Sequence, residues 1–182
     1  MRIRDAVRRI ADNHGMSVED HKAQAPESVA CFVLTVSDTR TLDNDTSGQA
    51  IAQLLEAAGH TVTGRLVVRD EPKDVTAAVR TSIALGIARV TITTGGTGVT
   101  SRDSTYEAIT ALLDKHLDGF GELFRSLSYA EIGAAAMLSR AIAGSIGDTI
   151  VISMPGSSNA VRLAMEKLVL PELRHLVFEL RK

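Results

Sequence analysis

Strand-like runs and helix-like segments alternate along most of the chain. The strand-like runs are rich in aliphatic and β-branched residues, which is typical of strands in a parallel sheet that is covered on both faces. The helix-like segments between them begin at capping residues or proline and end near glycine. Strands are predicted at residues 29–36, 61–68, 88–94 and 149–154. Helices are predicted at residues 47–58 and 72–85, after Ser104, and from Ser157 or Ser158 to Leu170, with a last segment starting at Pro171.

This alternation predicts an α/β fold, a three-layer sandwich with a mostly parallel central sheet. Two helix starts have the spacing of a capping box, in which a hydroxyl and a longer polar side chain three residues later satisfy the first backbone amides. These pairs are Thr46 with Gln49, and Ser104 with Glu107. Neither repeats nor an internal domain boundary interrupt the pattern.

A further helical stripe is formed by Phe120, Leu123, Phe124 and Leu127, which follow one another at positions i, i+3, i+4 and i+7. Core packing is the favoured interpretation of this stripe. A contact with another subunit is the alternative.

Residues 1–26 are predicted to be an N-terminal helical arm and linker, ahead of a single domain at residues 27–182. Ile3, Val7 and Ile10 recur at helical spacing, so this segment favours a surface or oligomer-contact helix. Its arginines are also compatible with an organelle-targeting peptide or a membrane-surface helix, but interspersed aspartates weaken both alternatives.

Composition excludes several classes of protein. The 182 residues include four Phe, two Tyr and no Trp, and the net charge is −2, so neither a base-stacking surface nor a broad positive field for nucleic acid is expected. The single cysteine, Cys31, excludes an internal disulfide and favours a reducing cytoplasm. No apolar stretch approaches the ~20 residues that span a bilayer. A cytoplasmic protein without nucleic-acid or membrane partners is therefore predicted.

Three polar loops follow predicted strands: residues 37–48, 93–103 and 154–160. Because the carboxyl ends of parallel strands share one edge of a sheet, these loops are expected to converge on a ligand site. The GGTG sequence at residues 95–98 lets backbone amides approach an anion, although a tight turn without a ligand is the alternative. It has neither the lysine of a P-loop nor the spacing of a dinucleotide motif.

Two carboxylates lie near the same edge. Asp70 follows the strand at 61–68, and Asp103 ends the glycine-rich loop. Such a pair could hold Mg²⁺, although each aspartate could instead cap a helix. Ser157 and Ser158 likewise could bind phosphate at a helix start or only cap it. The five histidines share no metal-ligand spacing, which makes a zinc site an unfavoured interpretation.

An ordered set of motifs resembles the MoaB/MogA family of molybdenum cofactor biosynthesis proteins and is most similar to its MoaB branch. From the N-terminal to the C-terminal end, the motifs are VSDTR, DTSG, TTGGTGVTSRDSTYEA, GFGELFRSLSYAEIG, SRAIAG and MPGSSNAV. The resemblance covers about residues 29–178. It implies a molybdopterin-binding fold that assembles into trimers or hexamers. It also implies a reaction in which Mg²⁺ and ATP adenylate molybdopterin before another enzyme of the pathway inserts molybdate.

The family motifs imply roles for individual residues. Asp70 and Asp103 match the two aspartates that support metal binding and transfer. Substrate-binding positions are matched by Ser37, Asp38, Ser47, Gly48, Gly95, Gly96, Thr97, Gly98, Pro155, Gly156 and Ser157. Two other functions stay open, a non-catalytic molybdopterin binder or carrier and a general small-molecule phosphotransferase.

Overall fold

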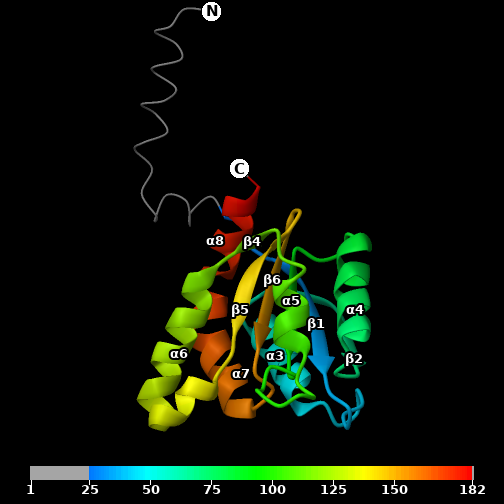
Figure 1. Ribbon diagram of the computed structural model, residues 1–182. Coiled ribbons are helices and arrows are strands. Elements are labelled where there is room, and N and C mark those ends of the chain that lie inside the picture. Colours follow the sequence, from blue (N-terminus) through cyan, green and yellow to red (C-terminus); the bar gives the residue numbers. More distant parts are fainter. Residues whose placement is uncertain (1–24, 182) are drawn as a thin grey trace, which may run out of the picture.

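The computed structural model describes residues 25–181 and has the expected three layers, with helices on both faces of a six-stranded sheet (Figure 1). The strand order is β2-β1-β3-β6-β5-β4. The four strands from β2 to β6 in this order are parallel, whereas β5 is antiparallel to β6 and β4 is antiparallel to β5. The prediction of a mostly parallel α/β sandwich is therefore confirmed. The strands are β1 (Ala30–Val36), β2 (Thr61–Val68), β3 (Val90–Thr94), β4 (Lys115–His116), β5 (Ile142–Ile146) and β6 (Thr149–Met154).

The helices divide into two layers. One face of the sheet is covered by α3 (Thr46–Ala57), α6 (Asp118–Ile132), α7 (Ser158–Ala164) and α8 (Leu170–Leu180). The other face is covered by α4 (Pro72–Ala84) and α5 (Thr105–Thr110). A 3-10 helix (Gly133–Leu138) follows α6, and a π-helical segment (Met165–Val169) joins α7 to α8.

Each face of the sheet carries its own apolar core, because successive side chains of a strand point to opposite faces. Val33 of β1 packs in the core under α3, α6, α7 and α8, whereas the next residue, Leu34, packs in the core under α4 and α5. Burial on both faces explains why the central strands are nearly continuous apolar runs.

Strands β4 and β5 were not among the predicted elements. β4 has only two residues, and the IAGSI sequence of β5 contains a glycine that is uncommon inside strands. Close packing against β4 requires this glycine, because a Cβ on Gly144 would lie 2.2 Å from the Lys115 carbonyl oxygen. The formation of β5 therefore depends on its contact with β4, because its own sequence has only a weak strand signal.

Both predicted capping boxes are wrong. Helix α3 is capped by Asp45, whose carboxylate accepts a hydrogen bond from the Gly48 N–H at 2.8 Å. A carboxylate is a stronger acceptor than the hydroxyl of Thr46 at this position. At α5, the Ser104 hydroxyl makes no cap and instead donates to Asp70.

The last helical segment, α8, begins at Leu170, one residue before the predicted start at Pro171, and the chain stays helical from α7 into it. Proline has no N–H to donate to the carbonyl four residues earlier. The π-helical segment immediately precedes this position, and the Leu170 N–H reaches back to the Met165 carbonyl across the wider turn.

The predicted stripe on α6 packs only in part into the core. Phe124 is fully buried and stacks on Phe120, with 6.5 Å between the ring centroids, but Leu123 is exposed. The helix predicted in the N-terminal arm lies outside the described residues. Within residues 25–181, no helix is long and apolar enough to cross a membrane.

Candidate functional site

The glycine-rich loop after β3 forms a cavity with the loop after β6. Gly95 and Gly96 both have positive φ, at 98° and 63°. The Gly95 backbone lies so close to β1 that a Cβ there would stand 2.2 Å from the Val36 carbonyl oxygen. The cavity has a volume of about 310 Å³, and its lining residues are Gly95, Gly96, Thr97, Gly98, Asp103, Leu138, Ser139, Pro155 and Gly156. Two of the three loops expected to converge therefore do so.

Asp103 places a carboxylate in this cavity. Its Oδ2 atom accepts hydrogen bonds from the Thr100 hydroxyl at 2.6 Å and from the Thr100 N–H at 3.1 Å. The hydroxyl contact, together with the N–H groups of Thr100 and Gly98 and the positive charge of Arg140, holds the pKa of Asp103 below its ordinary value. The cavity therefore contains an ionised carboxylate next to a row of loop amides.

Asp70 lies behind the same loop and does not line the cavity. Its buried Oδ1 atom accepts hydrogen bonds from the Ser104 N–H at 3.2 Å, the Ser104 hydroxyl at 3.0 Å and the Thr105 hydroxyl at 3.2 Å. A Cβ on Gly96 would lie 2.4 Å from Asp70 Oδ2, and a Cβ on Gly98 would lie 2.6 Å from Asp103 Oδ2. The two predicted carboxylates thus contact the loop at different glycines.

Asp38 connects the first loop to this edge of the sheet. Its Oδ1 atom accepts the Asp70 N–H at 3.2 Å, and its Oδ2 atom pairs with Arg102 Nε at 2.9 Å. The hydrogen bond from Arg102 lowers the pKa of Asp38. Arg102 also pairs with Glu71 at 2.7 Å, so one guanidinium group joins three loops. The preceding Ser37 makes a local turn, in which its hydroxyl oxygen accepts the N–H groups of Thr39 and Arg40.

Ser47 and Gly48 lie in the buried first turn of α3 and do not line the cavity. A Cβ on Gly48 would lie 2.1 Å from Asp45 Oδ2, so glycine is required for the cap itself. Asp45 also accepts the Thr35 hydroxyl at 2.9 Å and pairs with Arg65 at 2.9 Å. Ser47 and Gly48 therefore belong to the buried turn that holds the end of the first loop in place.

At the other loop, Pro155 and Gly156 line the cavity, and Ser157 caps α7 by accepting the Ala160 N–H at 3.3 Å. A Cβ on Gly156 would stand 3.2 Å from the Gly95 Cα atom, so the two loops are in backbone contact. The capping interpretation of Ser157 is therefore realised in the structure.

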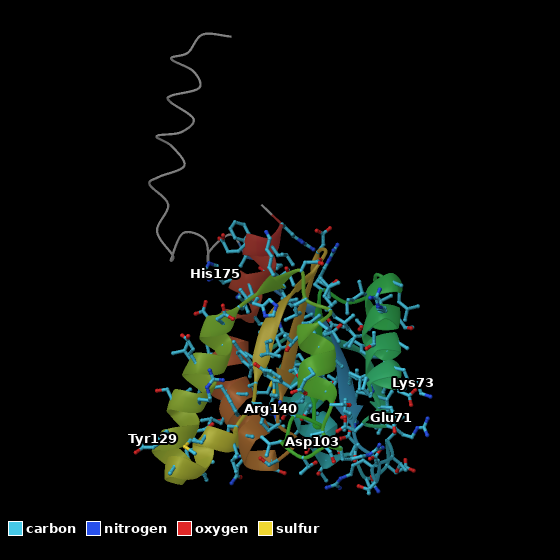
Figure 2. All side chains as sticks on the ribbon, in the orientation of Figure 1. Glu71, Lys73, Asp103, Tyr129, Arg140 and His175 are labelled. Carbon is cyan, nitrogen blue, oxygen red and sulfur yellow. The ribbon has the colours of Figure 1, made fainter. Side chains whose placement is uncertain are left out.

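Sequence reasoning missed the wall of the cavity that comes from the chain before β5. Leu138 and Ser139 line it, and Arg140 contacts the glycine-rich loop from outside. Figure 2 shows Arg140 and Asp103 at the same end of the molecule. The SRAIAG motif contains this arginine. Because the strand that follows it was not predicted, the local sequence could not indicate that Arg140 contacts the glycine-rich loop.

The donor set is compatible with Mg²⁺ bound together with a substrate. Among residues 25–181, no three His, Cys, Asp or Glu side chains lie close enough together to hold a metal ion. Mg²⁺ does not need such a cage, because it commonly takes one or two carboxylates, keeps waters and binds substrate phosphates. Asp103 beside the loop amides fits this mode of binding.

The comparisons with known proteins agree with this geometry. Residues 32–175 match the family model described as "Probable molybdopterin binding domain". Molybdenum cofactor biosynthesis protein B of Bacillus cereus is 55% identical over 168 residues, which cover 92% of this chain and 99% of that protein. Its Bacillus subtilis counterpart is 52% identical over 172 residues, with the same coverage of each chain.

Solved structures show the same relationship. A crystal structure of a molybdenum cofactor biosynthesis protein B superposes with a TM-score of 0.84 at 55% identity, covering 87% of this chain and 99% of the other. The tungsten cofactor synthesizing protein MoaB from Pyrococcus furiosus gives a TM-score of 0.78 at 39% identity, covering 87% of this chain and all of the other. With a matching family model over most of its length and such relatives, the chain belongs to the molybdopterin-binding domain family of the MoaB/MogA type.

Proposed function

We propose that this protein acts in molybdenum cofactor biosynthesis, where it binds molybdopterin and adenylates it with Mg²⁺ and ATP, releasing pyrophosphate. The observation that carries the proposal is the cavity in which the Asp103 carboxylate and the backbone of residues 95–98 lie side by side at the carboxyl edge of the parallel strands. Relatives named molybdenum cofactor biosynthesis protein B support the pathway.

The proposed reaction needs alignment and charge neutralisation more than acid–base catalysis. An ionised phosphate oxygen of molybdopterin bonds to the α-phosphorus of ATP, and the bond from that phosphorus to the bridging oxygen breaks, so that pyrophosphate leaves with the electron pair. No proton has to be removed from the nucleophile. The Gly95 N–H donates to the Met154 carbonyl oxygen at 3.1 Å and the Gly98 N–H is directed to Asp103, so the loop amides placed to donate to phosphate oxygens are those of Gly96 and Thr97. Such donors are most effective when they are fixed before the reaction.

Asp103 is the carboxylate placed to hold Mg²⁺ in the cavity, with Asp70 across Gly96 as the second candidate ligand. When bound, Mg²⁺ would neutralise phosphate charge and help to align the two anionic substrates. On the wall formed by the loop after β6, Pro155 and Gly156 present no bulky side chain, which leaves room for the phosphate groups.

Pyrophosphate release from molybdopterin, ATP and Mg²⁺ tests this proposal directly. Asp103→Asn is expected to lower the release rate by about a hundredfold or more while molybdopterin binding is retained. Asp148→Asn is the matched control, since Asp148 is exposed in the turn before β6, at the opposite edge of the sheet. No release by the wild-type protein, or an unchanged rate for Asp103→Asn, would overturn the proposal.

A molybdopterin binder without catalysis is the second candidate function, and the position of Asp70 favours it. Three hydrogen bonds already occupy Asp70 Oδ1, and this carboxylate is outside the lining of the cavity. The same assay separates the two functions, because a binder takes up molybdopterin but releases no pyrophosphate with ATP and Mg²⁺. General phosphotransferase activity would instead appear as equal use of unrelated phosphorylated pterins.

A further inference from the structure

Arg140 contacts the back of the glycine-rich loop with a fully engaged guanidinium group. Its Nε atom donates to the Thr97 carbonyl oxygen at 2.8 Å, and its Nη2 atom donates to the Gly98 carbonyl oxygen. Its Nη1 atom pairs with Glu107, and the guanidinium carbon lies 4.8 Å from the centroid of the Tyr106 ring. Contacts to all three nitrogens and to one face fix the orientation of a planar group.

These contacts complete a row of three restrained carbonyl groups. The Gly96 carbonyl oxygen accepts the Thr105 N–H at 2.9 Å, and the next two carbonyl oxygens in the chain accept Arg140. All three donors belong to segments outside the loop. The backbone of residues 96–98 is therefore held from one side by hydrogen bonds that the glycines could not supply themselves.

Restraining a carbonyl also orients the following amide. The C=O and N–H of one trans peptide unit point in opposite directions because the unit is planar. Because Arg140 bonds the carbonyls of Thr97 and Gly98, it turns the N–H groups of residues 98 and 99 away from itself, whereas Thr105 orients the N–H of Thr97. The Gly98 N–H is directed to Asp103, which lines the cavity.

We propose that Arg140 is a positioning residue that fixes the backbone of residues 97–99 and thereby the placement of the Asp103 carboxylate at the cavity, where a nucleotide would bind with Mg²⁺. This inference rests on the proposed function for the identity of its ligand. The important property of Arg140 is its planar fork more than its charge, because two neighbouring carbonyls and one carboxylate are engaged at once. Lysine presents a single ammonium group and cannot reproduce that arrangement.

The central test compares Arg140→Lys with Arg80→Lys, a control on an exposed position of α4. Titration calorimetry with ATP and Mg²⁺ measures binding, and amide hydrogen exchange of residues 95–99 is measured on the protein without ligand. Arg140→Lys is expected to weaken ATP binding by about tenfold to a hundredfold and to speed exchange in the loop, as changes to supporting partners of a site commonly do. Arg80→Lys is expected to change neither quantity.

Glu107→Gln provides a second variant in case Arg140→Lys folds poorly. Glu107 is itself exposed, with 62% of its side chain accessible, and its change removes one anchor of Arg140 while both loop carbonyls remain. Smaller effects in the same direction are expected. A purely structural role would lower the melting temperature and speed exchange throughout the domain, with ATP affinity per folded molecule unchanged.

The outcomes separate this inference from the proposed function. If the wild-type protein binds ATP and Arg140→Lys binds it equally well with unchanged loop exchange, the role of Arg140 is overturned and the proposed function stands. If wild-type protein binds ATP and Arg140→Lys loses affinity, but no pyrophosphate is released, the role of Arg140 stands and adenylation is overturned. If wild-type protein does not bind ATP, both are overturned.

Discussion

The carboxylate of Asp70 and the hydroxyl of Thr105 together occupy the space that a side chain at Gly96 would need, since a Cβ built there would stand 2.4 Å from Asp70 Oδ2 and 2.2 Å from Thr105 Oγ1. Gly96 also has a φ of +63°, which L-residues with a Cβ rarely adopt. Gly96→Ala is therefore expected to lower the free energy of unfolding by about 2–4 kcal/mol, from strain and overpacking together. Urea unfolding measures this change.

Gly86→Ala is the matched control for that substitution. Gly86 has a φ of +64°, nearly the same as Gly96, but a Cβ there would meet nothing within 4 Å. Its alanine variant should therefore lose only about 1–2 kcal/mol, the cost of the backbone conformation. Equal losses for the two variants would show that the close contact with Thr105 and Asp70 is not the reason for glycine at position 96.

The buried cap of α3 predicts a second large effect. Asp45, whose side chain is 1% exposed, accepts hydrogen bonds from Thr35 and Gly48 and pairs with Arg65. Asp45→Ala should lower the free energy of unfolding by about 2–4 kcal/mol, because it removes the cap and leaves a largely buried guanidinium group unpaired. Asp74→Ala tests an exposed pair with Arg69 and should cost less than about 1 kcal/mol. Similar losses for both variants would contradict a special role for burial.

Cys31 should be unreactive in the folded protein. Burial raises the pKa of its thiol from 9.0 to about 12, and the thiolate is the reactive form. A thiol reagent at pH 8 should therefore label the native protein only in proportion to its unfolded fraction, and label it fully in denaturant. Rapid native labelling at low denaturant would contradict this prediction.

The same shift has a consequence for stability at high pH. The unfolded thiol loses its proton above pH 9, whereas the folded thiol keeps it until about pH 12. The contribution of Cys31 is therefore fully present below pH 9 and is lost progressively between these two values. Cys31→Ala should show a smaller loss of stability over this range in pH-dependent unfolding.

His60 predicts a loss of stability on the acidic side. It is buried, and its Nδ1 atom accepts the Val29 N–H at 3.3 Å. Burial lowers the pKa of His60 below 6.5, and the charge of Arg174 adds to this effect. The unfolded state therefore binds the proton first, so the stabilisation is complete above pH 6.5 and declines as the pH falls toward the folded-state pKa.

The measurement is the melting temperature between pH 7 and pH 5. His60→Gln should flatten its decline over this range, whereas His116→Gln, at an exposed position on β4, should leave the decline unchanged. A wild-type slope that His60→Gln does not alter would contradict the assignment.

The central parallel strands were predictable because burial on both faces makes each of them an apolar run, as in β3 and β6. The contact between the loops that contain Gly95 and Gly156 was also predictable, because the carboxyl ends of parallel strands lie at one edge of the sheet. The antiparallel part was not predictable, since the IAGSI sequence of β5 has no strong strand signal and depends on its neighbours.

The roles of individual carboxylates also needed three-dimensional information. Sequence spacing suggested Thr46 as a cap, but Asp45 is held in that position by Arg65, which is twenty residues away. Similarly, nothing local distinguishes Asp103, which faces the cavity, from Asp70, which lies behind Gly96. Whether a carboxylate faces ligand or supports backbone depends on which loops fold over it.

The reversed direction of β5 decides which part of the chain can reach the cavity. Residues that precede a parallel strand lie at the far edge of the sheet, about 17 Å away for a strand of five residues. Because β5 travels against β6, the incoming segment at Leu138, Ser139 and Arg140 arrives where β3 and β6 depart. Insertions or deletions within residues 133–141 should therefore change the shape of the cavity. The hairpin turn at Gly147 and Asp148 lies at the opposite edge of the sheet, so its length can vary without affecting the cavity.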